Sequence, residues 1–252
     1  MKKLIATLCC TAFAVLLGSS PLFAQVAVLQ YRYVPPENVE EFIYRETTFW
    51  SEVARKAIDE GNMMGWELWQ RVGGIDMDEG ANFFFVNVFE NKDGIGQDGI
   101  WNPAAVFPDR RPEDMSTDGL STVKHQIILE AESFVGDLQP QFMKINYVKA
   151  SDLTRYIELE TTVWQPFITE QMNAKNTDQT SWGVASVLHP TGADTPFNAM
   201  TIDGFQTLSG AISPNWNPDV DVQTPDLTEF DEVHTKVWIQ SYALVKAVWP
   251  EQ

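Results

Sequence analysis

The chain has 252 residues, of which 35 are acidic and 17 are basic, so its formal net charge at neutral pH is −18. Nucleic acids and anionic membranes are polyanions, and an acidic excess of this size disfavours both as partners. A chain of this length is long enough to bury either one sizeable core or two small ones.

The first 24 residues predict a secretory signal. Two lysines give a basic start, an apolar run follows over 4–17, and small residues lead to Ala24. We therefore expect cleavage after Ala24, a periplasmic or extracellular location, and no membrane attachment once the signal is removed. Both cysteines lie in this segment, so the rest of the chain would hold no thiol for a disulfide, a zinc site or a nucleophile.

The rest of the chain is written twice. The segment YVPPENVEEFIYRETTFW, which starts at Tyr33, lies over YVKASDLTRYIELETTVW, which starts at Tyr147, without a gap. Further along, Trp66 matches Trp182 at nearly the same offset. Ordered matches of this kind indicate an internal duplication.

The triplet WNP also occurs twice, at 101–103 and at 216–218. The period of the duplication is far too long for a solenoid, so each copy should be a small domain or half-domain. We expect the first repeat over 26–139 and the second over 140–252.

Both repeats predict the same order of elements. Each opens with a strand of alternating polarity, continues with an amphipathic helix and two strands, and then has a long loop rich in Pro and Asp. A last helix closes each repeat. The expected elements of the first copy are a strand at 28–34, a helix over about 38–60, strands at 63–72 and 82–90, and a helix near 121–135. Those of the second are a strand at 143–148, a helix from 151, strands at 180–189 and 197–206, and a helix near 228–248.

This β-α-β-β-α order, present twice, resembles the ferredoxin-like plait and specifically the dimeric α+β barrel group. The resemblance covers nearly the whole chain after the signal and rests on element order and duplication. It implies an α+β fold of two tandem ferredoxin-like repeats, whose antiparallel sheets pack as one barrel within the chain. It also implies a pocket between sheet and helices, lined by aromatic residues and an acid or a histidine. No segment after the last predicted helix matches the fourth strand of that plait.

One glutamate in each repeat lies on the apolar face of its predicted helix. Helical periodicity places Glu46 and Glu160 inside the stripe that should face the core. A carboxylate in that position must be paired or hydrogen-bonded, or its pKa must rise until it is neutral. Two interpretations stay open: each glutamate holds the WNP loop to its helix, or each lines a pocket as a general base or ligand anchor. Glu46 and Glu160 are thus the candidate catalytic residues.

Aromatic residues that recur in both copies are the candidates for ligand contacts, namely Trp50, Trp164, Trp101, Trp216, Tyr33 and Tyr147. Core packing is the alternative role for the tryptophans predicted on helices. For the two loop tryptophans, the alternative is to plug the end of each half-domain. A small apolar or aromatic molecule is the expected ligand.

Polar residues of the predicted strands are expected on the face that points away from the helices. If two sheets pack face to face, these side chains would enter a shared cavity of the kind that binds small molecules. The alternative, which the sequence supports equally, is that this face of the sheet is exposed to solvent. The residues concerned are Gln30, Arg32, Glu67, Arg71, Asn87, Lys144, Asn146, His189 and Asp203.

Sequence motifs for metals and cofactors are weak. GIGQDG at 94–99 has the letters of a dinucleotide fingerprint, but a proline-containing segment follows it instead of a helix. The three histidines, His125, His189 and His234, are not spaced as metal ligands, and the acidic loops lack calcium-loop spacing. We expect no metal and no cofactor, although one axial histidine would be enough to hold haem.

Three functions follow from these patterns. The main expectation is a non-catalytic exported protein that binds a small molecule or serves as a scaffold. The resemblance implies a second, a cofactor-independent monooxygenase or isomerase that uses Glu46, Glu160 and the helix tryptophans. The third is an interaction module whose acidic loops bind a basic partner. An enzyme with one working site should show divergence of the two copies around one glutamate, whereas ETT survives in both. The sequence leaves oligomerisation open.

Overall fold

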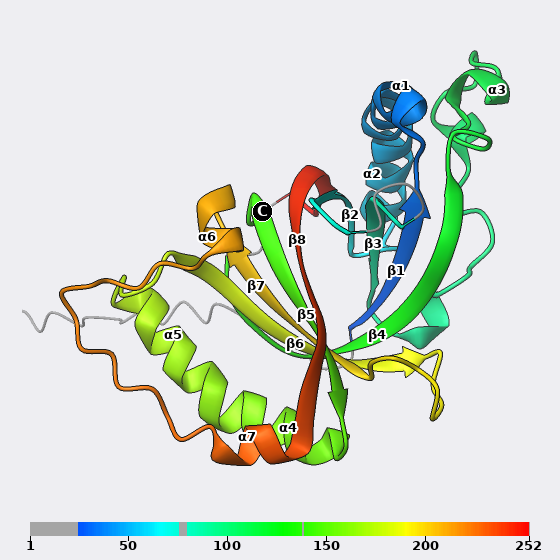
Figure 1. The fold of residues 1–252 in the computed structure, drawn as a ribbon. Coiled ribbons are helices and arrows are strands. Elements are labelled where there is room, and N and C mark those ends of the chain that lie inside the picture. Colours follow the sequence, from blue (N-terminus) through cyan, green and yellow to red (C-terminus); the bar gives the residue numbers. More distant parts are fainter. Residues whose placement is uncertain (1–24, 76–79, 138, 252) are drawn as a thin grey trace, which may run out of the picture.

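The structure is a computed structural model that describes residues 25–75, 80–137 and 139–251 (Figure 1). The predicted signal, 1–24, lies outside the described residues and stays a prediction. Across the described ranges, no helix is both long enough and apolar enough to cross a membrane.

Each half of the chain contains four strands and one long interrupted helix. In the first half these are β1 (Val26–Tyr33), α1 (Val39–Arg45), a π-helical turn (Glu46–Trp50), α2 (Ser51–Asp59), β2 (Gly65–Val72), β3 (Phe83–Phe89), α3 (Pro112–Met115) and β4 (Thr122–Gly136). In the second half they are β5 (Phe142–Ala150), α4 (Leu153–Leu159), a π-helical turn (Glu160–Trp164), α5 (Gln165–Asn173), β6 (Gln179–His189), β7 (Ala199–Phe205), α6 (Leu208–Ile212), α7 (Thr228–Val233) and β8 (His234–Val248). Short 3-10 turns lie at Pro36–Asn38, Lys92–Gly94 and Pro103–Ala105.

The eight strands close into one antiparallel barrel in the order β1-β3-β2-β8-β5-β7-β6-β4. Each half contributes a block of the ferredoxin-like order, β4-β1-β3-β2 and β8-β5-β7-β6. The two blocks are joined where β2 pairs with β8 and where β4 pairs with β6. Figure 1 shows the helices α1 and α2 on one half and α4 and α5 on the other, outside the strands. The predicted α+β fold, with one barrel built inside a single chain, is confirmed.

The helices predicted to close the two repeats are wrong, because both segments are mostly strand. The region 121–135 is part of β4, and in 228–248 only Thr228–Val233 is helical before β8 begins. These two strands are the fourth strands that the sequence did not reveal. In β4, Ile127 and Leu129 face the barrel interior and Ile128 packs on the helix side. Apolar residues on both faces make a run whose periodicity does not separate strand from helix.

Hydrogen bonds at the ends of β1 and β5 fix how the two halves correspond. The Asn82 side chain bonds the backbone N–H and C=O of Val34, and Asn198 does the same for Ala150. The strand offset is therefore 116, whereas the helical glutamates are 114 apart. The gapless alignment of the two opening strands was consequently wrong by two residues, and Tyr147 corresponds to Tyr31.

Three apolar clusters hold the molecule together. One lies between the first-half strands and α1–α2, and another between the second-half strands and α4–α5. The third fills the barrel interior and includes Tyr31, Trp69 and Tyr147. Each sheet is thus covered on both faces, so pockets can form either under the helices or inside the barrel.

Candidate functional site

The repeated ETT motif forms the same unusual turn in both halves. Glu46–Trp50 and Glu160–Trp164 are π-helical, and each interrupts a long α-helix. The Thr47 hydroxyl donates to the carbonyl of Ile43 and the Thr161 hydroxyl to that of Ile157, both at 2.8 Å. A π turn displaces the backbone register, and the threonine gives a carbonyl of the widened turn a partner. Such turns often occur at functional sites.

Glu46 lies in a small pocket between the helix and the sheet of the first half. The pocket has a volume of about 270 Å³ and includes Trp50, Trp101 and Arg32. Glu46 is buried and accepts a hydrogen bond of 2.8 Å from the Thr117 hydroxyl. Burial raises the pKa of Glu46 to about 7, against the opposing effects of Thr117 and Arg32.

Glu160 lies in the corresponding pocket of the second half, which has a volume of about 530 Å³. Trp164 and Trp216 line this pocket, as Trp50 and Trp101 line the first. Burial, together with the negative charge of Asp203, raises the pKa of Glu160 to about 7. A hydrogen bond from Tyr156 and the positive charge of Lys236 act in the opposite direction. At neutral pH this carboxyl is therefore close to half ionised.

The volumes differ because a large side chain in the first pocket is replaced in the second. The ring centroids of Phe85 and Trp66 are 5.9 Å apart. The Arg32 guanidinium carbon lies 5.2 Å from the centroid of the Phe85 ring. The strand register places Thr201 at the matched position of β7. A threonine leaves open the space that the phenylalanine ring fills.

The second pocket is also more polar than the first. The register of the strands gives four positions at which the second copy is the more polar, in the pairs Val28 and Lys144, Phe85 and Thr201, Asn87 and Asp203, and Val123 and Lys236. The exception is Arg32, which corresponds to Val148. The two copies thus keep the glutamate and its aromatic neighbours, and they diverge in the sheet residues beneath.

Asp203 is the centre of a polar network on the floor of the second pocket. It accepts hydrogen bonds from Asn146 Nδ2 at 3.2 Å and Gln179 Nε2 at 3.0 Å. Lys144 Nζ lies 3.7 Å from the same carboxylate. Burial raises the pKa of Asp203, and the lysine acts against this rise. In the first half Asn87 stands at this position, and its buried Oδ1 has no hydrogen-bond partner.

The structure brings together six of the eight predicted site residues. Glu46 with Trp50 and Trp101 forms one group, and Glu160 with Trp164 and Trp216 forms the other. Tyr33 and Tyr147 lie elsewhere. Lys124 Nζ lies 5.3 Å from the centre of the Tyr33 ring at the end of β1, and Tyr147 points into the barrel interior.

Most of the polar strand residues were assigned to the wrong face. Gln30, Arg32 and Asn87 line the pocket under the first-half helices, and Lys144, Asn146 and Asp203 line the second. The alternation of polar and apolar residues separates the two faces of each strand correctly. It does not indicate which of the two faces the helix covers. A match of the two copies at the correct offset would have exposed the substitutions at Lys144 and Asp203.

Within the described ranges, no group of three or more His, Cys, Asp or Glu side chains is placed to hold a metal ion.

Comparison with known proteins gives neighbours in structure only. No protein-family model matches the chain, and no curated protein matches it. A solved structure named "putative monooxygenase" from Lactobacillus acidophilus NCFM is 14% identical, with a TM-score of 0.55, covering 90% of this chain and 96% of that one. A protein of the same name from Fusobacterium nucleatum is 7% identical, with a TM-score of 0.55 and coverages of 90% and 95%. An anthrone oxidase-like protein is 11% identical, with a TM-score of 0.50 and coverages of 89% and 92%.

These neighbours correct the main functional expectation. A non-catalytic binding protein or scaffold was expected, whereas the names of the similar structures favour the enzyme alternative. At these identities the likeness itself concerns the fold. The chain has the fold of the dimeric α+β barrels, with both halves of the barrel supplied by one polypeptide.

Proposed function

We propose that this protein is a monooxygenase that works without a bound cofactor, and that its active site is the pocket around Glu160. The observation that carries the proposal is the divergence of the two copies. Both keep the π turn and its glutamate, but only the second has the enlarged, polar floor of Lys144, Thr201 and Asp203. Duplicated structural elements need no such divergence, whereas a single working site does.

The reaction that suits this site starts with removal of a proton. Glu160, with a pKa of about 7, would act as the base on an acidic C–H group of the substrate. The resulting carbanion would give its electrons to O₂, and protonation would yield a hydroperoxide. Loss of water then leaves a carbonyl group. In balance, CH₂ and O₂ become C=O and H₂O, and the substrate itself supplies all four electrons that reduce O₂, so no external reductant is needed.

The other pocket residues support this chemistry in two ways. Negative charge that develops on the substrate oxygen would be stabilised by the cationic Lys144 and Lys236. The aromatic side chains offer a surface for a flat substrate, because Trp164, Phe167 and Trp216 follow one another at ring distances of 5.2 and 6.0 Å. We therefore propose an aromatic substrate with an activated methylene, of the anthrone class.

Glu46 has a structural role in this proposal. Thr117 donates to Glu46, and the Trp50 indole donates to the Met115 carbonyl at 2.9 Å. Both contacts fasten the first-half helix to the segment around α3. The two interpretations of the repeated glutamate thus apply to different copies. Glu46 holds a loop segment to its helix, and Glu160 is the general base.

The test is oxygen uptake by the full chain with anthrone, comparing Glu160→Gln with the matched Glu46→Gln. Loss of a general base lowers rates by about 10²–10⁴-fold, so Glu160→Gln should lower kcat/KM at least 100-fold. Glu46→Gln should change it less than tenfold. Equal losses in both variants, or turnover that is indifferent to Glu160, would refute the assignment. Exchange of substrate hydrogen with solvent without oxygen uptake would favour an isomerase instead.

A further inference from the structure

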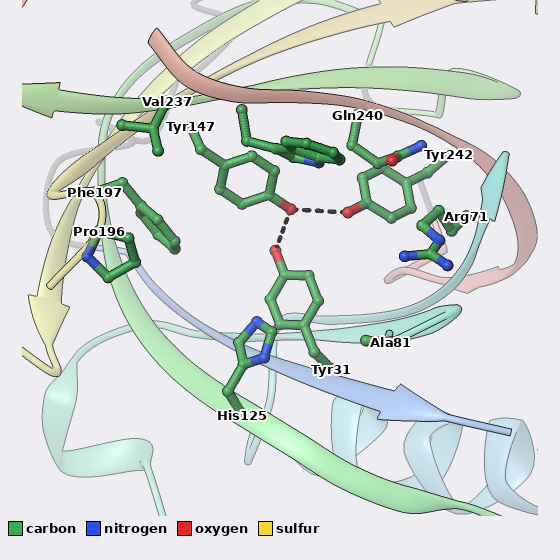
Figure 2. A pocket seen from close by; sticks show the side chains of 11 residues that line it. Tyr31, Arg71, Ala81, His125, Tyr147, Pro196, Phe197, Val237, Gln240 and Tyr242 are labelled. Carbon is green, nitrogen blue, oxygen red and sulfur yellow. Dashed lines mark hydrogen bonds between the residues drawn. The ribbon is translucent and has the colours of Figure 1, made fainter. Parts of the chain in front are cut away.

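The interior of the barrel opens into a third cavity that shares no lining residue with the two helix-side pockets. Its volume is about 250 Å³, and it lies at the end of the barrel where β1 and β5 finish and β4 and β8 begin. We call this cavity the barrel mouth. Figure 2 shows the hydroxyls of Tyr31, Tyr147 and Tyr242 meeting at its centre.

The three tyrosines form a chain of hydrogen bonds. The hydroxyls of Tyr31 and Tyr147 are 2.8 Å apart, and those of Tyr147 and Tyr242 are 2.9 Å apart. Three hydroxyls carry three protons, and the two bonds use two of them, so one proton remains for a further bond. Both bonds can reverse direction together. The Tyr31 hydroxyl, which is one end of the chain, can therefore either donate to a ligand oxygen or accept from it.

The chain is not a simple product of duplication. Tyr31 and Tyr147 occupy matched positions, but the position that matches Tyr242 is Leu129 in the first half. The third hydroxyl is thus particular to the second copy.

Flat aromatic side chains surround the tyrosine hydroxyls. His125 stacks on Tyr31 with ring centroids 4.2 Å apart, and Phe197 meets the Tyr147 ring edge-on at 4.9 Å. Trp238, at the position that matches His125, is 42% exposed and lines the opening. A cavity lined by aromatic side chains, with a few hydroxyls that point to its centre, is suited to a small aromatic ring with an oxygen substituent.

The charges of the mouth favour a neutral ligand. Burial raises the pKa of both Tyr31 and Tyr147 well above its usual value, and burial lowers the pKa of His125. All three are therefore uncharged at neutral pH. Among the described lining residues there is no Asp or Glu, and the cationic Arg71 already interacts with other parts of the chain.

We propose that the barrel mouth is a second ligand site, which binds a small neutral phenol. The ring would lie among His125, Phe197 and Trp238, and its hydroxyl would join the tyrosine chain at Tyr31. A phenol fits because its hydroxyl both donates and accepts, as the reversible chain requires. This site does not depend on the reaction proposed for Glu160.

The experiment is a titration of the full chain with 4-methylphenol, followed by tryptophan fluorescence. The wild-type signal should saturate, and Trp238→Phe should lose it. The comparison ligand is p-xylene, which has the same shape without the hydroxyl. One hydrogen bond of ordinary strength corresponds to roughly a tenfold change in affinity, so p-xylene should bind about tenfold more weakly.

The hydrogen bond to the tyrosine chain is tested by Tyr31→Phe, with Tyr44→Phe as the control because Tyr44 is exposed. Tyr31→Phe removes the hydroxyl that would bond the ligand, so it should weaken 4-methylphenol about tenfold and leave p-xylene unchanged. If that variant does not fold, the comparison of 4-methylphenol and p-xylene affinities on the wild-type protein still tests the proposal.

Absence of a Trp238-dependent signal, or equal affinity for both ligands, would overturn the proposal. Glu160→Gln should abolish turnover and keep the signal from Trp238, so the two proposals fail separately.

Discussion

Three glutamates are buried so deeply that their pKa values rise to about 7, namely Glu46, Glu67 and Glu160. Because burial disfavours the carboxylate, the folded state binds more protons than the unfolded state between about pH 4.5 and 7. The contribution of these three groups to the free energy of unfolding is then greatest below about pH 4.5 and decreases as the pH rises through 7. Each group contributes on the order of 3 kcal/mol to this decrease, at about 1.4 kcal/mol per pKa unit.

Glu67 offers the clearest test because it lies outside all three cavities. Its carboxylate accepts hydrogen bonds from the indoles of Trp69 at 2.7 Å and Trp249 at 3.1 Å. Glu67→Gln removes the titration, so the loss of stability between pH 5 and pH 8 should shrink by about 1–3 kcal/mol. Urea unfolding at both pH values measures it. An unchanged difference would mean that Glu67 ionises normally.

Among the single elements, the two π turns differ in their threonine bonds: Thr161 and Thr162 both donate to helix carbonyls in the second half, whereas one threonine does so in the first. Thr47 bonds the Ile43 carbonyl, whereas its neighbour Thr48 is exposed and makes no side-chain hydrogen bond in the described structure. Thr47→Val should therefore lower the free energy of unfolding by about 1–2 kcal/mol, and Thr48→Val should change it by less than about 0.5 kcal/mol. Chemical denaturation compares the two. Equal effects would show that the hydroxyl does not stabilise the turn.

Elements were predictable where local pattern and tertiary environment agree. The opening strands, the interrupted helices and the two middle strands follow from alternation and helical periodicity, and Glu46 and Glu160 stood out against the apolar stripe. The strands β4 and β8 were missed because apolar residues lie on both faces in their middle parts, which erases alternation there. The π turns have no periodic signal of their own. Only the repetition of ETT pointed to them.

The site was predictable in part for the same reason. Repetition identified the glutamates and four tryptophans that line the two pockets. It did not rank the copies, because the opening strands were aligned at an offset of 114. The substitutions that distinguish the copies, such as Asn87 and Asp203, are visible at the offset of 116 that Trp66 and Trp182 share and that the Asn82 and Asn198 hydrogen bonds fix. The residues that the two copies share predicted the lining of the pockets. The residues that differ between the two copies support the functional proposal.

At the scale of the whole molecule, duplication within one chain frees the two halves to differ. A barrel assembled from two identical chains has two identical pockets, so a change that improves one alters the other. Here β2–β8 and β4–β6 pairing keeps the barrel closed, while the helix-side pockets differ twofold in volume. It follows from the proposed function that the second half carries the chemistry and the first half supports it.

The most direct measurement of that claim is the pH dependence of kcat/KM for oxygen uptake with anthrone. Because the base must be ionised, the rate should rise with pH and level off above about 7, the pKa of Glu160. Glu46→Gln should keep this profile, although Glu46 has a similar pKa. A profile that loses its inflection in Glu46→Gln, or that shows none near pH 7 in the wild type, would contradict the claim.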